Sequence, residues 1–136
     1  MPEIVVTHAG GDALRVETRG HVMMADQPVE DGGGDLAPTP TELFVAGLGA
    51  CIGYYAERFL RRSGLPTDGL RVGCSYTWAD NPHRVGEIFI EVEAPGLPEA
   101  KREAFERVID KCTLHNTLRR PPSVRVTLVP SGAVVA

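Results

Sequence analysis

The sequence predicts one α+β domain, residues 1–136, in which antiparallel strands wrap two central helices. The chain of 136 residues is long enough for one hydrophobic core but too short for two independent cores. Apolar residues alternate with polar ones in several short segments, which is typical of strands, and recur every three or four residues in two others, which is typical of helices. The predicted order is three strands, a helix, two strands, a helix and a final strand.

The N-terminal part predicts a meander of three short antiparallel strands. They cover residues 4–6, 14–18 and 21–24, and a turn at residues 10–12 joins the first two. Residues 26–40 are rich in Gly, Pro and Asp, which cannot hold regular structure cheaply. We therefore expect a loop there.

A long helix is predicted to begin at Pro40 and to end near Ser63, before Gly64. Proline suits the first helical position because it lacks the N–H group that would go unpaired there, and Thr39 can cap the helix. The first half of this helix is apolar on nearly every side, so one sheet cannot cover it. A homodimer is the simplest arrangement that would cover the rest.

The second half of the chain predicts a β-hairpin, a helix and a last strand. The hairpin strands cover residues 70–78 and 85–93, and the segment between them has the composition of a turn. The helix is expected to start at Pro98 and to carry Cys112 on its buried face at its end. Apolar and polar residues alternate at 124–129, which predicts the final strand.

Composition excludes several classes of function. The net charge of −4 and the pI near 5.5 disfavour a nucleic-acid partner, which would require clustered Lys and Arg. The N-terminus has no basic stretch followed by an apolar core, so we expect a cytoplasmic location. The apolar run at residues 43–56 falls short of the roughly 20 residues that a membrane span requires, so we expect no membrane partner.

Three cysteines are the main candidates for chemistry. An odd number of cysteines without an export signal favours reduced thiols over a disulfide framework. Cys74 alternates within a predicted strand and is interpreted as a packing residue. Cys51 lies mid-helix and fits either a buried core position or a reactive thiol. Its neighbours Gly47, Gly49 and Gly53 each cost the helix roughly 0.8 to 1 kcal/mol relative to alanine, so another backbone or a ligand is expected to approach closely.

Two further residues could assist a thiol site. Cys112 and His115 have a Cys-x-x-His spacing, but no companion motif supplies the other ligands that zinc requires. His115 can instead favour the thiolate of Cys112 or cap the helix end. Glu42 can stabilise the first turn of its helix or serve as the partner of a charged group.

Two segments of the sequence resemble the OsmC/Ohr family of osmotically inducible and organic hydroperoxide resistance proteins. Residues 40–51 read PTELFVAGLGAC, and residues 112–124 read CTLHNTLRRPPSV. Both motifs occur in the family's order and separation, and the predicted order of strands and helices is similar over nearly the whole chain. The resemblance implies the OsmC-like fold, an intertwined homodimer with active sites at the subunit interface, and a thiol mechanism without a metal or cofactor.

The resemblance also implies roles for individual residues. Cys51 corresponds to the peroxidatic cysteine and Cys112 to the resolving one, and a dithiol reductant would reset the pair. Established peroxidases of the family also use an acidic residue in the helix motif and an arginine near the first strand turn. Here the acidic residue is Glu42 rather than position 41, and residues 8–13 contain no arginine. Arg19 is the expected substitute, and Arg15 is the alternative.

The expected function is therefore a thiol-dependent peroxidase that reduces organic hydroperoxides in oxidative-stress defence. Leu48 and Tyr55 are expected to bind the substrate, since the surroundings of Cys51 are apolar. The alternative is a non-enzymatic protein of the same fold that binds a small hydrophobic or electrophilic ligand at the dimer interface. The missing arginine is the feature that favours this alternative.

Overall fold

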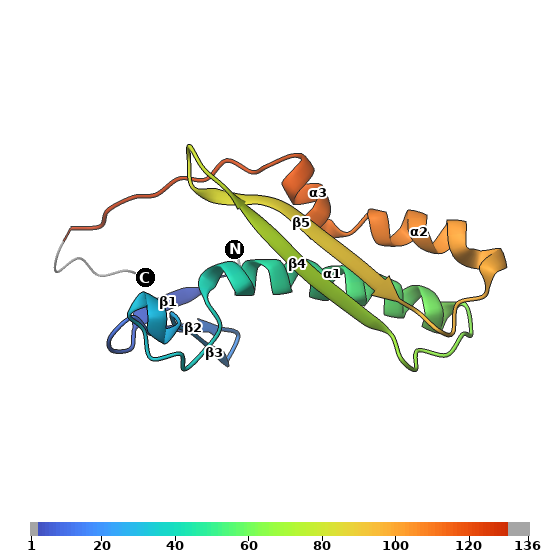
Figure 1. Ribbon diagram of the computed structural model, residues 1–136, viewed down its shortest axis with the longest axis horizontal. Coiled ribbons are helices and arrows are strands. Elements are labelled where there is room, and N and C mark those ends of the chain that lie inside the picture. The colour runs from blue at the N-terminus through green and yellow to red at the C-terminus, as the bar shows by residue number, and fades with distance from the viewer. Residues whose placement is uncertain (1–2, 131–136) are drawn as a thin grey trace.

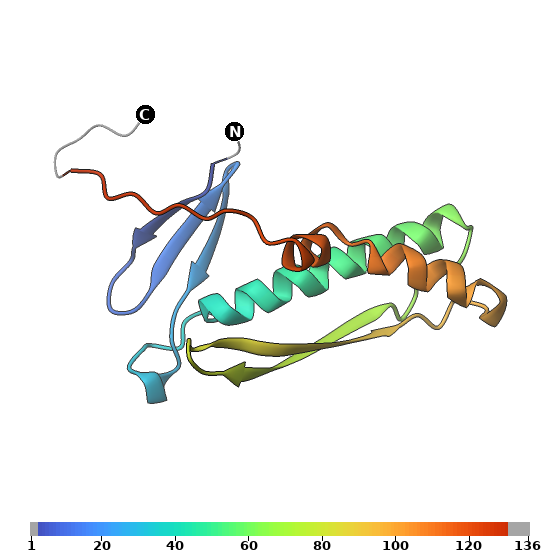
Figure 2. The ribbon, with the colours of Figure 1, turned by 90° about the horizontal axis from the view of Figure 1, so that it is seen from above.

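The computed structural model describes residues 3–130, and these form two small antiparallel sheets and three α-helices (Figure 1). The α+β class predicted from the sequence is confirmed. One long helix runs through the centre, with a two-stranded sheet on one side of it and the two shorter helices on another (Figures 1 and 2).

The N-terminal sheet has the strand order β1-β2-β3, with β1 at Val5–His8, β2 at Leu14–Thr18 and β3 at His21–Ala25. Both pairings are antiparallel, as the meander predicted. Gly10 and Gly11 form the first turn with φ values of +103° and +55°, a backbone conformation that favours glycine. The sheet lies beyond the N-terminal end of the central helix (Figures 1 and 2).

The segment between this sheet and the central helix is a loop, as predicted, with one 3-10 turn at Val29–Asp31. The buried side chain of Asp26 organises it, since its carboxylate accepts hydrogen bonds from the backbone N–H groups of Gln27 and Leu36. These bonds hold the pKa of Asp26 below its usual value, with the Leu36 contact the larger cause.

The central helix α1 spans Pro40–Arg62, close to the predicted bounds. Its N-terminus is a capping box: Glu42 N–H donates to Thr39 Oγ1 at 3.1 Å, and Thr39 N–H donates to Glu42 Oε1 at 2.9 Å. The predicted cap is therefore confirmed, with Glu42 as its second member.

The hairpin consists of β4, Arg71–Ala79, and β5, Arg84–Glu93. Val72, Cys74 and Tyr76 pair with Val92, Ile90 and Ile88. Because side chains alternate between the faces of a strand, these six residues share one face, and that face packs on α1.

The predicted second helix is in fact two helices. A 3-10 turn at Glu99–Lys101 leads into α2, Arg102–Asp110, and a separate helix α3 spans Thr113–Arg119. Cys112 does not end a helix but occupies the N-cap of α3, where its ψ of 135° interrupts the helical path. The apolar spacing of three and four runs on past the end of α2 to Cys112 itself, so periodicity alone did not reveal the break before it. The prediction that Cys112 is buried is confirmed.

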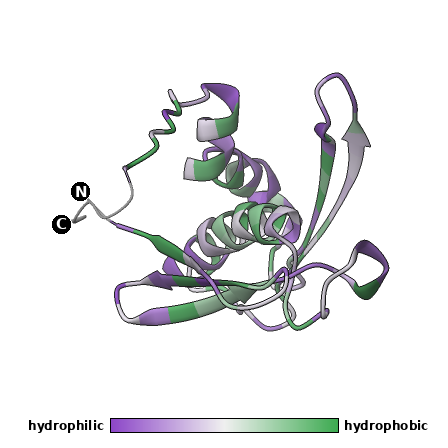
Figure 3. Ribbon diagram, turned by 90° about the vertical axis from the view of Figure 1, so that its left-hand side faces the viewer, coloured by the Kyte–Doolittle hydropathy of each residue, from purple (hydrophilic) through white to green (hydrophobic). Residues whose placement is uncertain are grey.

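The predicted last strand is wrong for the single chain. Residues 121–130 form no strand, and Val126 and Leu128 are each 94 % exposed. The sequence does alternate there, as Figure 3 shows for the segment after α3. A strand requires a hydrogen-bonding neighbour, and within residues 3–130 none lies alongside this segment.

Two hydrophobic clusters form the core along α1. One contains Leu48, Ile52 and Cys112, and the other contains Ala56, Leu60 and Phe105. Among residues 3–130, α1 is the one helix long and apolar enough to cross a membrane by length and composition, a test that the core helix of a soluble protein also passes. Its position between the hairpin and the other helices is that of a core helix.

Candidate functional site

The glycines of α1 allow neighbouring elements to approach the helix closely. A Cβ atom at position 49 would lie only 2.6 Å from Cys74 Sγ on β4, and one at position 53 would lie 3.5 Å from Val72. On another face, a Cβ atom at Gly47 would lie 3.8 Å from Leu114 of α3. Tight packing of the hairpin therefore accounts for Gly49, whereas a methyl group at Gly47 or Gly53 would make only ordinary contacts.

Cys51 and Cys112 come together where α3 meets α1. Cys112 is fully buried with Leu48 and Ile52, and the partly buried Cys51 packs against this cluster. Burial raises the pKa of the Cys112 thiol above its usual range, and the neighbouring Cys51 thiol raises it further through hydrogen bonding and charge repulsion. The backbone N–H groups of His115 and Leu114 act in the opposite direction. Both thiols are free.

The two residues expected to bind substrate lie in the same place. Leu48 belongs to the buried cluster, and Tyr55 packs against it. The Tyr55 hydroxyl shares a hydrogen bond of 2.9 Å with Thr113 Oγ1, at the start of α3. The structure thus brings four predicted site residues together: Cys51, Cys112, Leu48 and Tyr55.

A cavity of about 950 Å³ opens beside the cysteine pair. Leu48 and Ile52 belong both to its wall and to the cluster that holds Cys51 and Cys112, so these two side chains stand between the cavity and the pair, and neither cysteine itself lines the wall. Its wall is mainly apolar, with Phe44, Val85, Ile88, Ile90 and Leu118 among its members. Three basic side chains also line it, namely Arg84, His115 and Arg119.

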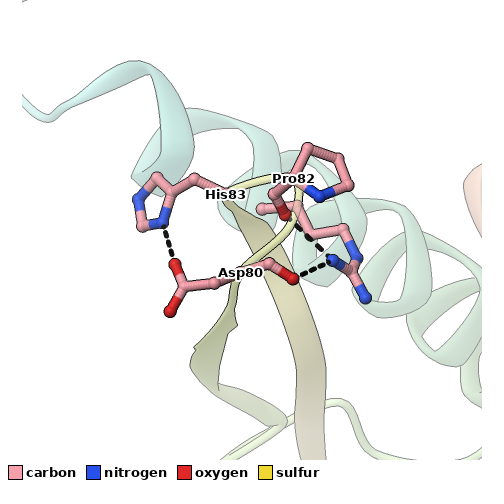
Figure 4. Close-up of polar contacts among 4 residues, drawn as sticks. Asp80, Pro82 and His83 are labelled. Carbon is pink, nitrogen blue, oxygen red and sulfur yellow. Dashed lines mark hydrogen bonds and ion pairs between the residues drawn. The ribbon is translucent and has the colours of Figure 1, made fainter.

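The hairpin turn and α2 fix two of these basic side chains. Arg84 Nη1 donates to the backbone carbonyls of Asp80 and Pro82, each at 2.9 Å (Figure 4). Arg119 donates from Nη1 to the backbone carbonyl of Asp110 at 3.0 Å and from Nη2 to Asp110 Oδ1 at 2.6 Å. Both guanidinium groups therefore have fixed positions at the cavity. Figure 4 also shows the Asp80–His83 contact of 3.0 Å at the tip of the turn.

The remaining predicted site residues lie elsewhere in the chain. Glu42 is exposed, and its carboxylate is engaged in the helix cap. Arg19 is exposed in the turn between β2 and β3, with a φ of +49°. Arg15 of β2 forms an ion pair with Glu17. The two arginines thus belong to the sheet beyond the N-terminal end of α1, and Glu42 belongs to the first turn of that helix (Figures 1 and 2).

The Cys112–His115 pair gathers no metal-binding set. Within residues 3–130, no group of three or more His, Cys, Asp or Glu side chains is arranged to hold a metal ion.

Sequence reasoning missed Thr113, Arg84 and Arg119. Thr113 directly follows Cys112, so its place beside the site could have been suspected once Cys112 was singled out. Arg84 and Arg119 reach the cavity only because the hairpin and α3 both pack on α1, and no periodicity indicates that arrangement.

Fold and site together define an α+β protein whose central helix presents one of two neighbouring thiols beside an apolar cavity. Residues 32–127 match the model of the OsmC-like protein family. The chain therefore belongs to the OsmC-like family, as the two motifs indicated. Among curated proteins, none shows significant similarity to this chain.

Solved structures share the fold. A protein from Psychrobacter arcticus 273-4 connected with osmotic stress and detoxification has a TM-score of 0.77 at 21% identity, and the match covers 86% of this chain and 88% of the other. The organic hydroperoxide resistance protein OsmC of Legionella pneumophila has a TM-score of 0.65 at 22% identity, with 86% and 89% covered. OhrB of Bacillus subtilis, also an organic hydroperoxide resistance protein, has a TM-score of 0.63 at 17% identity, with 89% and 92% covered.

Proposed function

We propose that this chain is a cytoplasmic thiol-dependent peroxidase that reduces organic hydroperoxides through Cys51 and Cys112. The observation that carries the proposal is the pairing of a partly exposed thiol with a buried one beside an apolar cavity. The names of the structural neighbours from Legionella pneumophila and Bacillus subtilis support the same function.

The proposed cycle has three steps. The Cys51 thiolate attacks the O–O bond of the hydroperoxide, the alcohol departs after taking up a proton, and Cys51 becomes a sulfenic acid. The Cys112 sulfur then attacks the Cys51 sulfur, and the hydroxyl group leaves as water with the Cys112 proton. A dithiol reductant finally reduces the protein disulfide by thiol–disulfide exchange. The protein regains its two thiols, and the reductant becomes a disulfide.

The assignment of the two roles follows from exposure. Cys51 can meet a substrate because it is partly exposed, whereas Cys112 is fully buried and can meet only a neighbour. Burial raises the pKa of the Cys112 thiol and so disfavours its thiolate form. Only thiolates attack peroxides efficiently, so this shift speaks against Cys112 as the attacking group and supports the assignment that exposure gives.

The cavity favours organic peroxides over hydrogen peroxide. Its apolar wall would bury an alkyl or aryl group, which hydrogen peroxide lacks.

We further propose that the active form is a homodimer. The central helix leaves Phe44 and Tyr54 about half exposed, and the alternating segment at residues 124–129 has no strand neighbour within residues 3–130. A second copy can cover the helix and pair with this segment, since an unpaired apolar strand is otherwise a liability.

Turnover of cumene hydroperoxide with dithiothreitol tests the function. Cys51→Ser is expected to reduce turnover to the uncatalysed background, while the matched Cys74→Ser variant keeps wild-type turnover. Cys112→Ser is expected to turn over more slowly than wild type, because dithiothreitol itself must then reach and reduce the Cys51 sulfenic acid. Unchanged steady-state turnover in Cys51→Ser would refute the proposal.

One observation favours a second candidate, a non-enzymatic protein that binds a hydrophobic or electrophilic ligand in the cavity. Arg19 lies in the turn between β2 and β3, in the sheet beyond the N-terminal end of α1 (Figures 1 and 2), and residues 8–13 contain no arginine that would hold a thiolate. Binding of an apolar fluorescent probe to wild-type and Cys51→Ser protein, without peroxide turnover in either, would support this candidate.

A further inference from the structure

We propose that the hydrogen bond between Tyr55 and Thr113 is a clamp that positions Cys112 for disulfide formation with Cys51. The inference rests on the proposed redox pairing of the two cysteines, and it adds two positioning residues to it. Neither side chain needs to touch the substrate.

Each residue of the clamp lies close in sequence to one of the two cysteines. Tyr55 follows Cys51 by four residues on α1, which places the two side chains on the same face of the helix, one turn apart. Thr113 is the residue directly after Cys112. The bond of 2.9 Å between their hydroxyl groups therefore joins the two backbone segments that carry the sulfurs.

α3 needs such an anchor because its other contacts constrain it less. It has only seven residues, and an isolated helix of that length is unstable in water. The Arg119–Asp110 ion pair holds α3 to α2, not to α1. Leu114 packs over Gly47, an apolar contact without directional preference.

Apart from the contact between the two thiols themselves, Tyr55–Thr113 is the only side-chain hydrogen bond within residues 3–130 between α1 and the segment from Glu99 to Arg120. Apolar packing keeps Cys112 in the cluster, but a directional bond restricts how α3 slides or rotates on α1. Since Cys112 is the N-cap of α3, any such movement displaces its sulfur from Cys51.

The experiment measures the equilibrium between the reduced protein and oxidised dithiothreitol. Each protein disulfide formed consumes one oxidised dithiothreitol, which takes up the two thiol hydrogens and becomes the dithiol. The ratio of products gives the effective concentration of one cysteine at the other. Cys74→Ser protein serves as the background, so that Cys51 and Cys112 are the two remaining thiols.

Tyr55→Phe and Thr113→Val each remove one hydroxyl and keep the shape of the side chain. Each is expected to lower the effective concentration about threefold to tenfold, the size expected for one hydrogen bond. The double variant is expected to lose no more than either single variant, because both remove the same bond. Thr113→Ser, which retains the hydroxyl, is expected to restore the wild-type equilibrium.

Tyr54→Phe is the matched control. Tyr54 is adjacent on the same helix, but its hydroxyl accepts a hydrogen bond from Arg58 at 3.1 Å rather than bonding to α3. This variant is expected to leave the equilibrium unchanged. An equal loss in Tyr54→Phe, additive losses in the double variant, or an unchanged equilibrium in Tyr55→Phe would each overturn the clamp.

Because no peroxide takes part, this test is separate from that of the proposed function. A protein that fails to reduce cumene hydroperoxide but shows the expected pattern with dithiothreitol would refute the peroxidase proposal and support the clamp. A protein that reduces the peroxide with an equilibrium insensitive to Tyr55 would do the reverse.

Discussion

The two halves of α1 differ in how completely the rest of the chain covers them. In the C-terminal half, from Gly53 to Arg62, Ala56 and Leu60 are fully buried against Phe105, and the rings of Phe59 and Phe105 meet edge to face at 5.4 Å. In the N-terminal half, from Pro40 to Ile52, the core adjoins an open cavity. One half is closed and stabilises the fold, whereas the other is left open where the cysteine pair lies.

Truncation of one leucine in each half gives the largest expected contrast in stability. Leu60→Ala removes a fully buried side chain from the closed half and is expected to lower the free energy of unfolding by about 2–5 kcal/mol. Leu48→Ala is expected to cost less, because Leu48 already borders a cavity and its removal creates less new void. Urea unfolding of the reduced proteins measures both. Equal losses would contradict the distinction between the halves.

The glycines offer a second contrast, within the open half. Gly49→Ala is expected to cost about 1–3 kcal/mol, because its methyl group would lie 2.6 Å from Cys74 Sγ. Gly47→Ala meets Leu114 only at 3.8 Å and is expected to stabilise the helix by up to about 1 kcal/mol. Thermal unfolding checks the opposite signs. Cys74→Ala in the Gly49→Ala background removes the obstructing sulfur and should restore most of the loss.

The helix cap separates a structural role of Glu42 from a catalytic one. Thr39→Ala is expected to cost about 1 kcal/mol through loss of the cap. Glu42→Gln should keep both stability and peroxide turnover, since glutamine also completes a capping box. Turnover and urea unfolding are measured on the same samples. A loss of turnover at unchanged stability would assign Glu42 to the chemistry.

The smallest effect concerns the pH dependence of Cys112. Burial and the Cys51 thiol raise its pKa in the folded protein, so its contribution to stability is complete below the unfolded-state pKa and is lost as the pH rises through the folded one. Site-resolved alkylation by iodoacetamide should give a midpoint for Cys112 at higher pH in folded than in urea-unfolded protein. A midpoint at equal or lower pH would contradict the buried, paired environment.

Much of the fold was predictable because local signals agreed with the final structure. Thr39 and Pro40 marked the start of α1, and the alternation in the hairpin strands gave the face that packs on the helix. The break at Cys112 was not predictable from spacing, because the apolar pattern runs beyond the end of α2 as far as Cys112 itself. The prediction of a final strand was wrong because alternation shows only that a segment can pair, not that a neighbouring strand is present.

Part of the site was also predictable from local signals in the sequence. The glycines around Cys51 indicated a close approach, and the structure shows it at Gly49, where β4 is the approaching element. Leu48 and Tyr55 follow from their position on that helix. The basic side chains at the cavity come from the hairpin turn and from the end of α3, and only tertiary packing joins these to α1.

The position of Cys112 after the hairpin and α2 has a consequence for resistance to unfolding. A disulfide from Cys51 to Cys112 would enclose β4, β5 and α2 in one covalent loop. Closing a loop of this length restricts the unfolded chain enough to favour the folded state by about 4 kcal/mol in the chain-entropy model. The oxidised protein would therefore melt at a higher temperature than the reduced protein. In a mixture, the share of the higher-melting form would report how much of the protein is still oxidised.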